Sequence, residues 1–138
     1  MRSAHVVAQH AIAEPQNGSL QLSEIFGTAA DSAPRAPFVA RADREQEWEQ
    51  SSAEGFLVKT LFSDPATGDR TLLMQYAPGA YAGPHSHDQI EHVYVLDGSF
   101  TDEYGSYGKG DYLMRVPGAV HSARTDEGAT VLLLYTRP

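Results

Sequence analysis

Residues 83–98 read GPHSHDQIEHVYVLDG, and this stretch joins a cluster of candidate metal ligands to a candidate β-strand. Three histidines and one glutamate lie within the eight positions 85–92. An apolar run and an Asp-Gly turn follow directly. The stretch predicts either a metal site built onto a strand or a polar loop rich in histidine. A metal site is the better interpretation only if the rest of the chain supplies a barrel and a further ligand.

The spacing of the polar residues indicates which of them share a face. His85 and His87 are two positions apart, so on an extended chain their side chains point to the same side. A bend at 88–89 would let both histidines converge with Glu91. Because side chains alternate along a strand, His92 points away from Glu91 and is predicted to lie outside the site.

A fourth donor comes from a later segment. Neutral imidazoles with one carboxylate suit a first-row divalent ion, but three such ligands leave a site that needs another protein donor or several waters. The segment GDYLMRVPGAVH (110–121) places His121 after a Pro-Gly turn, at the start of a predicted strand. If this segment runs beside the strand that carries Glu91, His121 reaches the metal from the opposite side.

The remaining signals are almost all strand and turn. Short apolar runs alternate with Gly, Pro and Asp, which is typical of an all-β sandwich or barrel. The predicted strands and hairpin are PFVA (37–40), GFLVKTLF (55–62), RTLLMQYA (70–77), the alternating IEHVYVLDG (90–98), the hairpin SFTDEYGSYGKGD (99–111), YLMRVPG (112–118) and TVLLLYT (130–136).

The first 36 residues differ from the rest, because they are rich in Ala, Ser, Gln and Pro. We therefore predict an N-terminal arm or linker over 1–36 and a barrel over 37–138. Two interpretations of the arm stay open: a loosely held segment, or one that packs on a partner subunit.

Composition excludes several classes of protein. The chain of 138 residues has a formal net charge of −8, which argues against a nucleic-acid or anionic-membrane partner. It contains no cysteine, so disulfides, thiolate metal sites and cysteine nucleophiles are excluded. No apolar run is long enough for a transmembrane helix, and the N-terminus does not resemble a signal peptide. We therefore expect a cytoplasmic protein.

On these residues the chain resembles the cupin superfamily. The first cupin motif, with its spaced glycines, H-x-H and glutamate, is met without a gap, and the second is met except that Val116 replaces a proline and Thr125 an asparagine. The matching positions are Gly79, His85, His87, Glu91, Gly98, Gly110, Gly118 and His121. The resemblance implies a single-domain jelly-roll β-barrel that binds one metal through His85, His87, Glu91 and His121.

A narrower likeness involves the second half of the chain. VLDGSFTDEYGSYGKGDYLMRVPGAVHS (95–122), with DEGATVLLLY (126–135) after it, resembles the zinc-binding cupin domain of ChrR-type anti-sigma factors and its stand-alone relatives. Those regulators carry an additional helical domain that grips the sigma factor. The residues before the barrel here look poorly helical, so a sigma-binding role is not predicted.

Three functions are compatible with such a site. The first is a metal-dependent dioxygenase that acts on a small diketone-like or phenolic compound, with Fe²⁺ as the metal and Glu91 doubling as a catalytic base. The second is a non-catalytic, ChrR-like regulatory or ligand-binding cupin with structural Zn²⁺. The third, a sugar epimerase, would leave the metal ligands unexplained.

Other features of the site remain open at this stage. Mn²⁺ and Ni²⁺ are further candidates, because the ligand set does not choose the metal. Arg115 interrupts an apolar strand and is interpreted as a surface arginine whose stem covers apolar surface, with pairing to an anionic substrate as the alternative. The resemblance also implies a homodimer formed through a sheet edge.

Overall fold

The structure is a computed structural model that describes Ile25 and residues 45–138. Within residues 45–138 the regular elements are β-strands, as predicted for an all-β protein. The predicted strand 37–40 lies outside the described residues, as does the predicted arm apart from Ile25. The strands are β1 (Glu49–Gln50), β2 (Phe56–Ser63), β3 (Arg70–Tyr76), β4 (Tyr81–His85), β5 (Ile90–Thr101), β6 (Ser106–Gly108), β7 (Tyr112–Arg115), β8 (His121–Arg124) and β9 (Ala129–Thr136).

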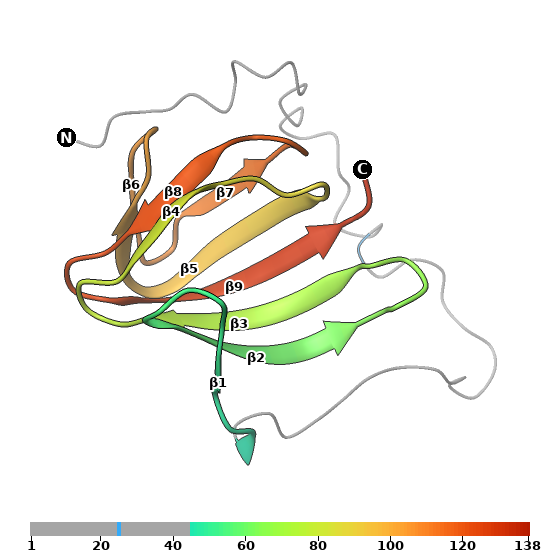
Figure 1. Cartoon of the computed structure of the whole chain (residues 1–138), viewed down its shortest axis with the longest axis horizontal. Helices are drawn as coiled ribbons and strands as arrows, with labels where there is room; N and C mark the ends of the chain where they lie inside the picture. The colour runs from blue at the N-terminus through green and yellow to red at the C-terminus, as the bar shows by residue number, and fades with distance from the viewer. Residues whose placement is uncertain (1–24, 26–44) are drawn as a thin grey trace.

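The strands form one antiparallel sheet that curls into a barrel (Figure 1). Its main path runs β1-β2-β3-β9-β5-β8-β4, and β6 and β7 also pair with β5. Side chains from β2, β3, β4, β5, β7, β8 and β9 line a common cavity, so the curled sheet encloses an interior. This is the architecture that a jelly-roll barrel requires.

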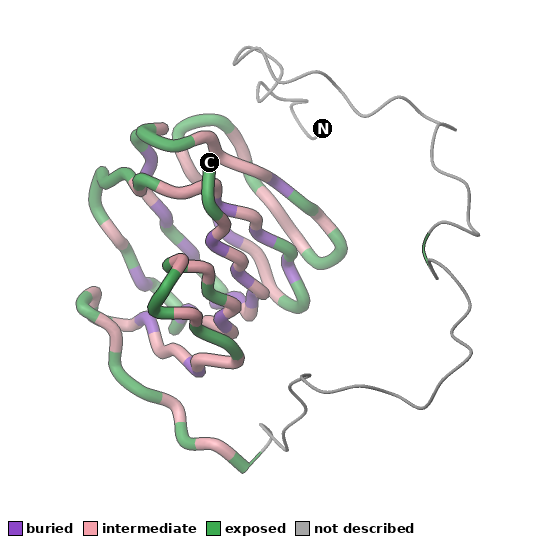
Figure 2. Tube along the Cα trace, turned by 90° about the vertical axis from the view of Figure 1, so that its right-hand side faces the viewer, coloured by how far each residue is buried: buried purple, intermediate pink, exposed green. Residues whose placement is uncertain are grey.

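Alternation along the strands builds the core. In β9, every second residue is buried, from Ala129 through Val131 and Leu133 to Tyr135, and buried and less buried positions alternate along the trace in Figure 2. Three aromatic rings pack edge to face, with Phe56 4.6 Å and Phe100 5.5 Å from the Tyr76 ring centroid. The predicted strand over 130–136 is therefore confirmed, with the side chains of one face forming the barrel wall.

Glycine at position 98 fixes how β5 meets β9. Gly98 has φ of 70°, and a Cβ on it would lie 2.1 Å from the carbonyl oxygen of Gly128. The β5–β9 register also shifts between Val95 and Asp97, which marks a bulge just before Gly98. Glycine is required here both for the left-handed conformation and for the close backbone approach.

Most predicted strands are confirmed, and two, the two-residue β1 and β4, were not predicted. The predicted hairpin over 99–111 is formed by the end of β5 and β6. β4 was not predicted, because its sequence YAGPH lacks both alternation and β-branched residues, and four of its five residues are exposed. Within the described residues, no helix has the length and hydropathy that a membrane span requires.

Candidate metal centre

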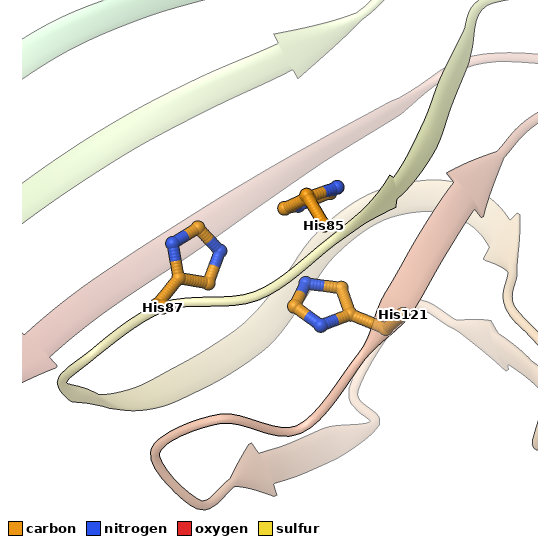
Figure 3. Close-up of side chains that lie close together, drawn as sticks. All are labelled: His85, His87 and His121. Atoms are coloured by element: carbon orange, nitrogen blue, oxygen red, sulfur yellow. The ribbon is translucent and has the colours of Figure 1, made fainter.

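Three histidines from two neighbouring strands and a loop meet inside the barrel (Figure 3). His85 ends β4, His121 begins β8, and the two are paired across these strands. His87 lies in the loop between β4 and β5. Each imidazole offers one nitrogen, and the three nitrogens lie within 4.8 Å of one another, so together they could hold a metal ion. The predicted convergence of these three residues is confirmed.

Backbone carbonyls orient two of the imidazoles. His85 Nδ1 lies 2.7 Å from the carbonyl oxygen of Gly83, and His121 Nδ1 lies 3.0 Å from that of Ala119. Because a carbonyl only accepts, each Nδ1 makes this contact by carrying a proton, and in the neutral ring Nε2 then keeps its lone pair for a metal. Histidine ligands in metal sites are commonly oriented by this kind of contact.

The third imidazole has a nitrogen without a hydrogen bond. His87 Nε2 is buried and has no hydrogen-bond partner among the described residues, although it lies 3.1 Å from Glu91 Oε2. An unsatisfied buried nitrogen is uncommon and calls for an unseen partner such as an ion. Burial, followed by the charge of Arg115, lowers the pKa of His121 and favours its neutral form, which is the form that binds a metal. The donor set therefore fits a divalent transition ion.

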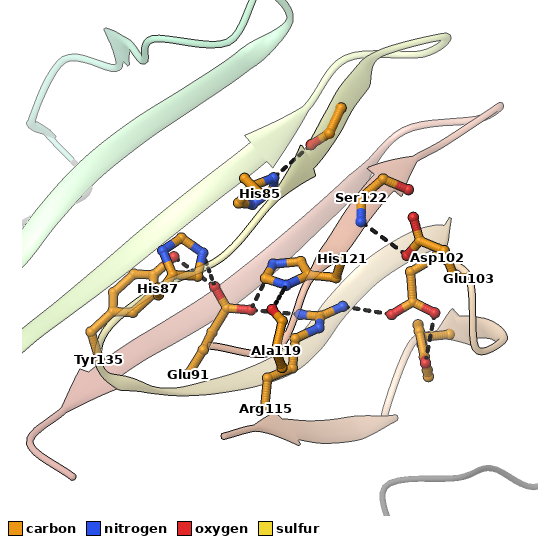
Figure 4. Close-up of polar contacts among 12 residues, drawn as sticks. His85, His87, Glu91, Asp102, Glu103, Arg115, Ala119, His121, Ser122 and Tyr135 are labelled. Atoms are coloured by element: carbon orange, nitrogen blue, oxygen red, sulfur yellow. Dashed lines mark hydrogen bonds and ion pairs between the residues drawn. The ribbon is translucent and has the colours of Figure 1, made fainter. Parts of the chain in front are cut away.

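Glu91 approaches the cluster but also has strong partners of its own (Figure 4). Its Oε1 accepts a hydrogen bond from Arg115 Nη1 at 2.5 Å, and its Oε2 accepts one from the Tyr135 hydroxyl at 2.7 Å. Oε1 also lies 3.6 Å from His121 Nε2. Burial alone would raise the pKa of Glu91, but His87, Arg115 and Tyr135 together lower it to about 2. A carboxylate this acidic suits a ligand role better than a base role, because it takes up a proton weakly.

Arg115 is buried between two carboxylates, so its interpretation as a surface arginine was wrong. Its side chain is 9% exposed, and Nη2 donates to Asp102 Oδ2 at 2.6 Å. Asp102 is held in turn by the Tyr107 hydroxyl at 3.0 Å and by the backbone N–H groups of Tyr104 and Gly105. The alternation of β7 places Arg115 inside, opposite Glu91. Its charge can be buried because two carboxylates compensate it.

The route by which His121 reaches the site differs from the prediction. We expected the segment 110–121 to bring His121 beside the strand that carries Glu91. Its first half does run there as β7, which pairs with β5 at Glu91 and Arg115. The chain then turns, and His121 sits on β8 against β4. The Pro-Gly turn at 117–118 thus separates the strand that supplies Arg115 from the strand that supplies His121.

Two predicted residues have different outcomes. His92 lies on the other face of β5 from Glu91, with Nδ1 2.7 Å from the Tyr112 hydroxyl, so its predicted orientation away from Glu91 is confirmed. Glu91 as a fourth metal ligand stays a prediction.

Sequence reasoning missed two partners in the network around Glu91. The sequence predicts Tyr135 only as part of the strand over 130–136 and Asp102 only as part of the hairpin over 99–111, and it gives neither a role in the site. The alternation over 130–136 could have revealed Tyr135, since it places that residue on the inner face with Val131 and Leu133. Nothing in the sequence pairs Asp102 with Arg115.

The histidines open onto a cavity of about 560 Å³ inside the barrel. Burial, followed by the charge of Glu91, raises the pKa of both Tyr76 and Tyr135, so their hydroxyls stay protonated and can donate. The remaining wall is mainly apolar, formed by Phe56, Val58, Leu72, Met74, Phe100 and Leu133. Such a cavity fits a small organic molecule with a few polar groups.

Comparison with known proteins identifies the fold and the family. The family model for the ChrR cupin-like domain matches residues 38–138. No curated protein matches the chain.

Three solved structures are similar. An RmlC-like cupin from Shewanella frigidimarina NCIMB 400 is 17% identical, with a TM-score of 0.63 over 75% of this chain and 93% of that chain. The polyketide cyclase RemF from Streptomyces resistomycificus is 17% identical, with a TM-score of 0.64 over 74% and 81%. An acetylacetone dioxygenase from Acinetobacter johnsonii is 14% identical, with a TM-score of 0.62 over 79% of each chain. At these identities the likeness shows the cupin fold alone.

Proposed function

The chain belongs to the family of ChrR cupin-like domains, and from that premise we propose that it is a metal-dependent dioxygenase acting on a small diketone-like or phenolic compound. The observation that carries the proposal is the meeting of three histidine nitrogens at a cavity large enough for such a compound. The occurrence of an acetylacetone dioxygenase among proteins of this fold supports it.

The protein's own residues would have distinct tasks. His85, His87 and His121 would hold the metal, and Glu91 is proposed as the fourth ligand. A divalent ion bound there would supply a Lewis acid and, as Fe²⁺, a centre for dioxygen chemistry. Tyr76 lines the cavity, and its hydroxyl would orient a substrate oxygen by donating a hydrogen bond. The apolar wall would exclude bulk water from the reacting groups.

Oxygen consumption by iron-reconstituted protein tests the proposal. Apo protein is loaded with Fe²⁺ without air, and dissolved O₂ is followed after addition of a panel of diketones and catechols. We expect one substrate class to consume O₂ in proportion to substrate lost. The matched controls are the zinc-loaded protein and H121A treated with Fe²⁺. If no compound raises O₂ consumption above that of H121A, the dioxygenase proposal fails.

A second candidate is a regulatory cupin with structural zinc, favoured by the family match itself. The two functions differ in the coordination of the metal, because catalysis needs a position open to substrate whereas a structural site is closed. X-ray absorption of the zinc protein as purified separates them. Four protein ligands without an exchangeable water would favour the regulatory function.

The association state is also a proposal. Tyr94, Leu96 and Tyr112 are exposed on the outer face of β5 and β7, and aromatic residues of this kind are enriched in protein interfaces. We propose that the protein is a homodimer, which sedimentation at micromolar concentration would test; a monomer across that range would contradict it. Its cytoplasmic location stays a prediction.

A further inference from the structure

Four polar side chains form a row across the inner face of the sheet. Strand pairing places Arg70 opposite Tyr135, Tyr135 opposite Glu91, and Glu91 opposite Arg115. Residues directly opposite on neighbouring strands project from the same face. All four line the cavity that contains the histidines. The row therefore connects the metal centre to the start of β3, where Arg70 is exposed.

The charges of this row balance once Asp102, the second partner of Arg115, is included. Arg115 contacts Glu91 and Asp102, so two carboxylates surround one guanidinium. Arg70 is the second guanidinium, which makes the group neutral overall. A dication held by three neutral imidazoles would leave two uncompensated positive charges inside the barrel. In a partly enclosed site such an excess strongly favours an anionic ligand.

Arg70 has the surroundings of a ligand-binding group. Its guanidinium lies 4.7 Å from the centroid of the Tyr135 ring, a cation–π contact. Within residues 45–138 no carboxylate forms an ion pair with it, and the neighbouring Asp69 contacts Arg137 instead. A guanidinium that lies over an aromatic ring can still donate through its N–H groups, and these match a carboxylate with two parallel hydrogen bonds.

The other carboxylate that lines the cavity is remote from Arg70. Glu54 comes just before β2, whose first residue Phe56 pairs with Tyr76 at one end of β3. Arg70 is at the other end of β3, opposite Ser63. The two ends of β3 are about 20 Å apart at the usual rise of a strand. The end of the cavity next to Arg70 is therefore the end suited to negative charge.

We propose that the ligand of this cavity is a small organic anion, a carboxylate or an enolate, and that Arg70 binds its charge. This rests on the proposed function in treating the histidine cluster as a metal centre and the cavity as the substrate site. The anion would lie in the cavity between the Arg70 guanidinium and the histidines. Arg70 is thus assigned as the residue that determines specificity for charged over neutral compounds.

Calorimetric titration of the zinc-loaded protein tests the assignment, because binding can be measured without turnover. The probes are acetoacetate and methyl acetoacetate, which share a 3-oxo framework and differ in charge. We expect the wild type to prefer acetoacetate by about tenfold or more, as a charge-assisted hydrogen bond provides. R70Q should reduce this preference to about twofold, and R70K should recover part of it. R124Q is the matched control, because Arg124 is exposed on β8 and does not line the cavity.

Two results would overturn the assignment: equal affinity of the wild type for both probes, or a wild-type preference retained in R70Q. R70M keeps the apolar stem that packs on Tyr135 and serves as the second uncharged variant if R70Q does not fold. Failure of the dioxygenase proposal is distinguishable, since it would appear as absent O₂ consumption while the anion preference persists. Equal affinity of the wild type for both probes, with O₂ consumption intact, would overturn only the assignment of an anionic ligand to Arg70.

Discussion

Glu91 and His92 are neighbours in β5, and each contacts a tyrosine hydroxyl, yet they belong to different environments. Glu91 is 4% exposed and contacts Arg115, Tyr135 and two histidines inside the barrel. His92, one residue later, contacts Tyr112 on the outer face. The period of two along a strand thus decides which of two similar polar residues belongs to the candidate site.

The two faces also differ in what a lost contact costs. A polar group inside the barrel that loses its partner cannot recover a hydrogen bond from water, so the full desolvation penalty appears. On the outer face, water replaces the lost partner at little cost. The following substitutions test this difference in cost between the inner and the outer face of the barrel.

Removal of the buried cation should have the largest effect. R115M leaves the carboxylates of Glu91 and Asp102 in the interior without their shared guanidinium, which we expect to lower the free energy of unfolding by about 3–5 kcal/mol. R124M, at an exposed arginine, should change it by less than about 0.5 kcal/mol. Urea unfolding of the metal-free proteins measures both. A loss below about 1 kcal/mol in R115M would contradict the network in which Arg115 joins Glu91 to Asp102.

Substitution of Gly98 should disturb the pairing of β5 with β9, the two strands that place Glu91 and Tyr135 inside the barrel. In G98A the new methyl group meets the Gly128 carbonyl at 2.1 Å, and φ is 70°. We expect a loss of about 3 kcal/mol from strain and overpacking together. Gly79 has φ of 80°, but a methyl group added there would meet nothing within 4 Å beyond its chain neighbours, so G79A should lose about 1 kcal/mol from strain alone. Equal losses in thermal or urea unfolding would show that the close approach of Gly98 to Gly128 is unimportant.

Paired tyrosine substitutions measure the contrast itself. Y135F removes a hydrogen bond to a buried carboxylate and should cost about 2 kcal/mol. Y112F removes the hydroxyl beside His92 on the outer face and should cost less than about 0.5 kcal/mol. Equilibrium unfolding of the two variants under one set of conditions gives the difference directly. Similar costs would mean that the two faces are not distinguished by solvent access.

Much of the fold could be predicted because its signals are local. Alternation predicted β5, and an apolar run predicted β9. Glycines at motif positions predicted turns, which Gly79, Gly110 and Gly118 form with positive φ angles. The Asp-Gly turn predicted at 97–98 was wrong, because Gly98 lies within β5 next to a bulge. β4 escaped prediction, because its residues are mostly exposed and therefore carry no alternating pattern. It is held in the sheet by pairing with β8, which is a long-range interaction that no short stretch of sequence records.

The histidines of the candidate site could be predicted from the sequence. The buried charged residues around Glu91 could not. Spacing placed His85 and His87 on one side, and the Pro-Gly turn placed His121 at a strand start. The location of Arg115 inside the barrel depends on Asp102. Asp102 lies in the hairpin turn between the end of β5 and β6, far along the chain from Arg115's own strand neighbours. A charge is buried only when its partners are already in place, so its position follows from the tertiary structure and not from its neighbours in the chain.

The central claim is that the inner histidines form a metal centre and the outer one does not. Zinc bound per chain after equilibrium dialysis, measured for the wild type, H85A, H121A and H92A, tests it most directly. The account predicts one zinc ion in the wild type and H92A, and an affinity lowered by more than about 100-fold in H85A and H121A. Wild-type zinc content in both H85A and H121A, or its loss in H92A, would contradict the account.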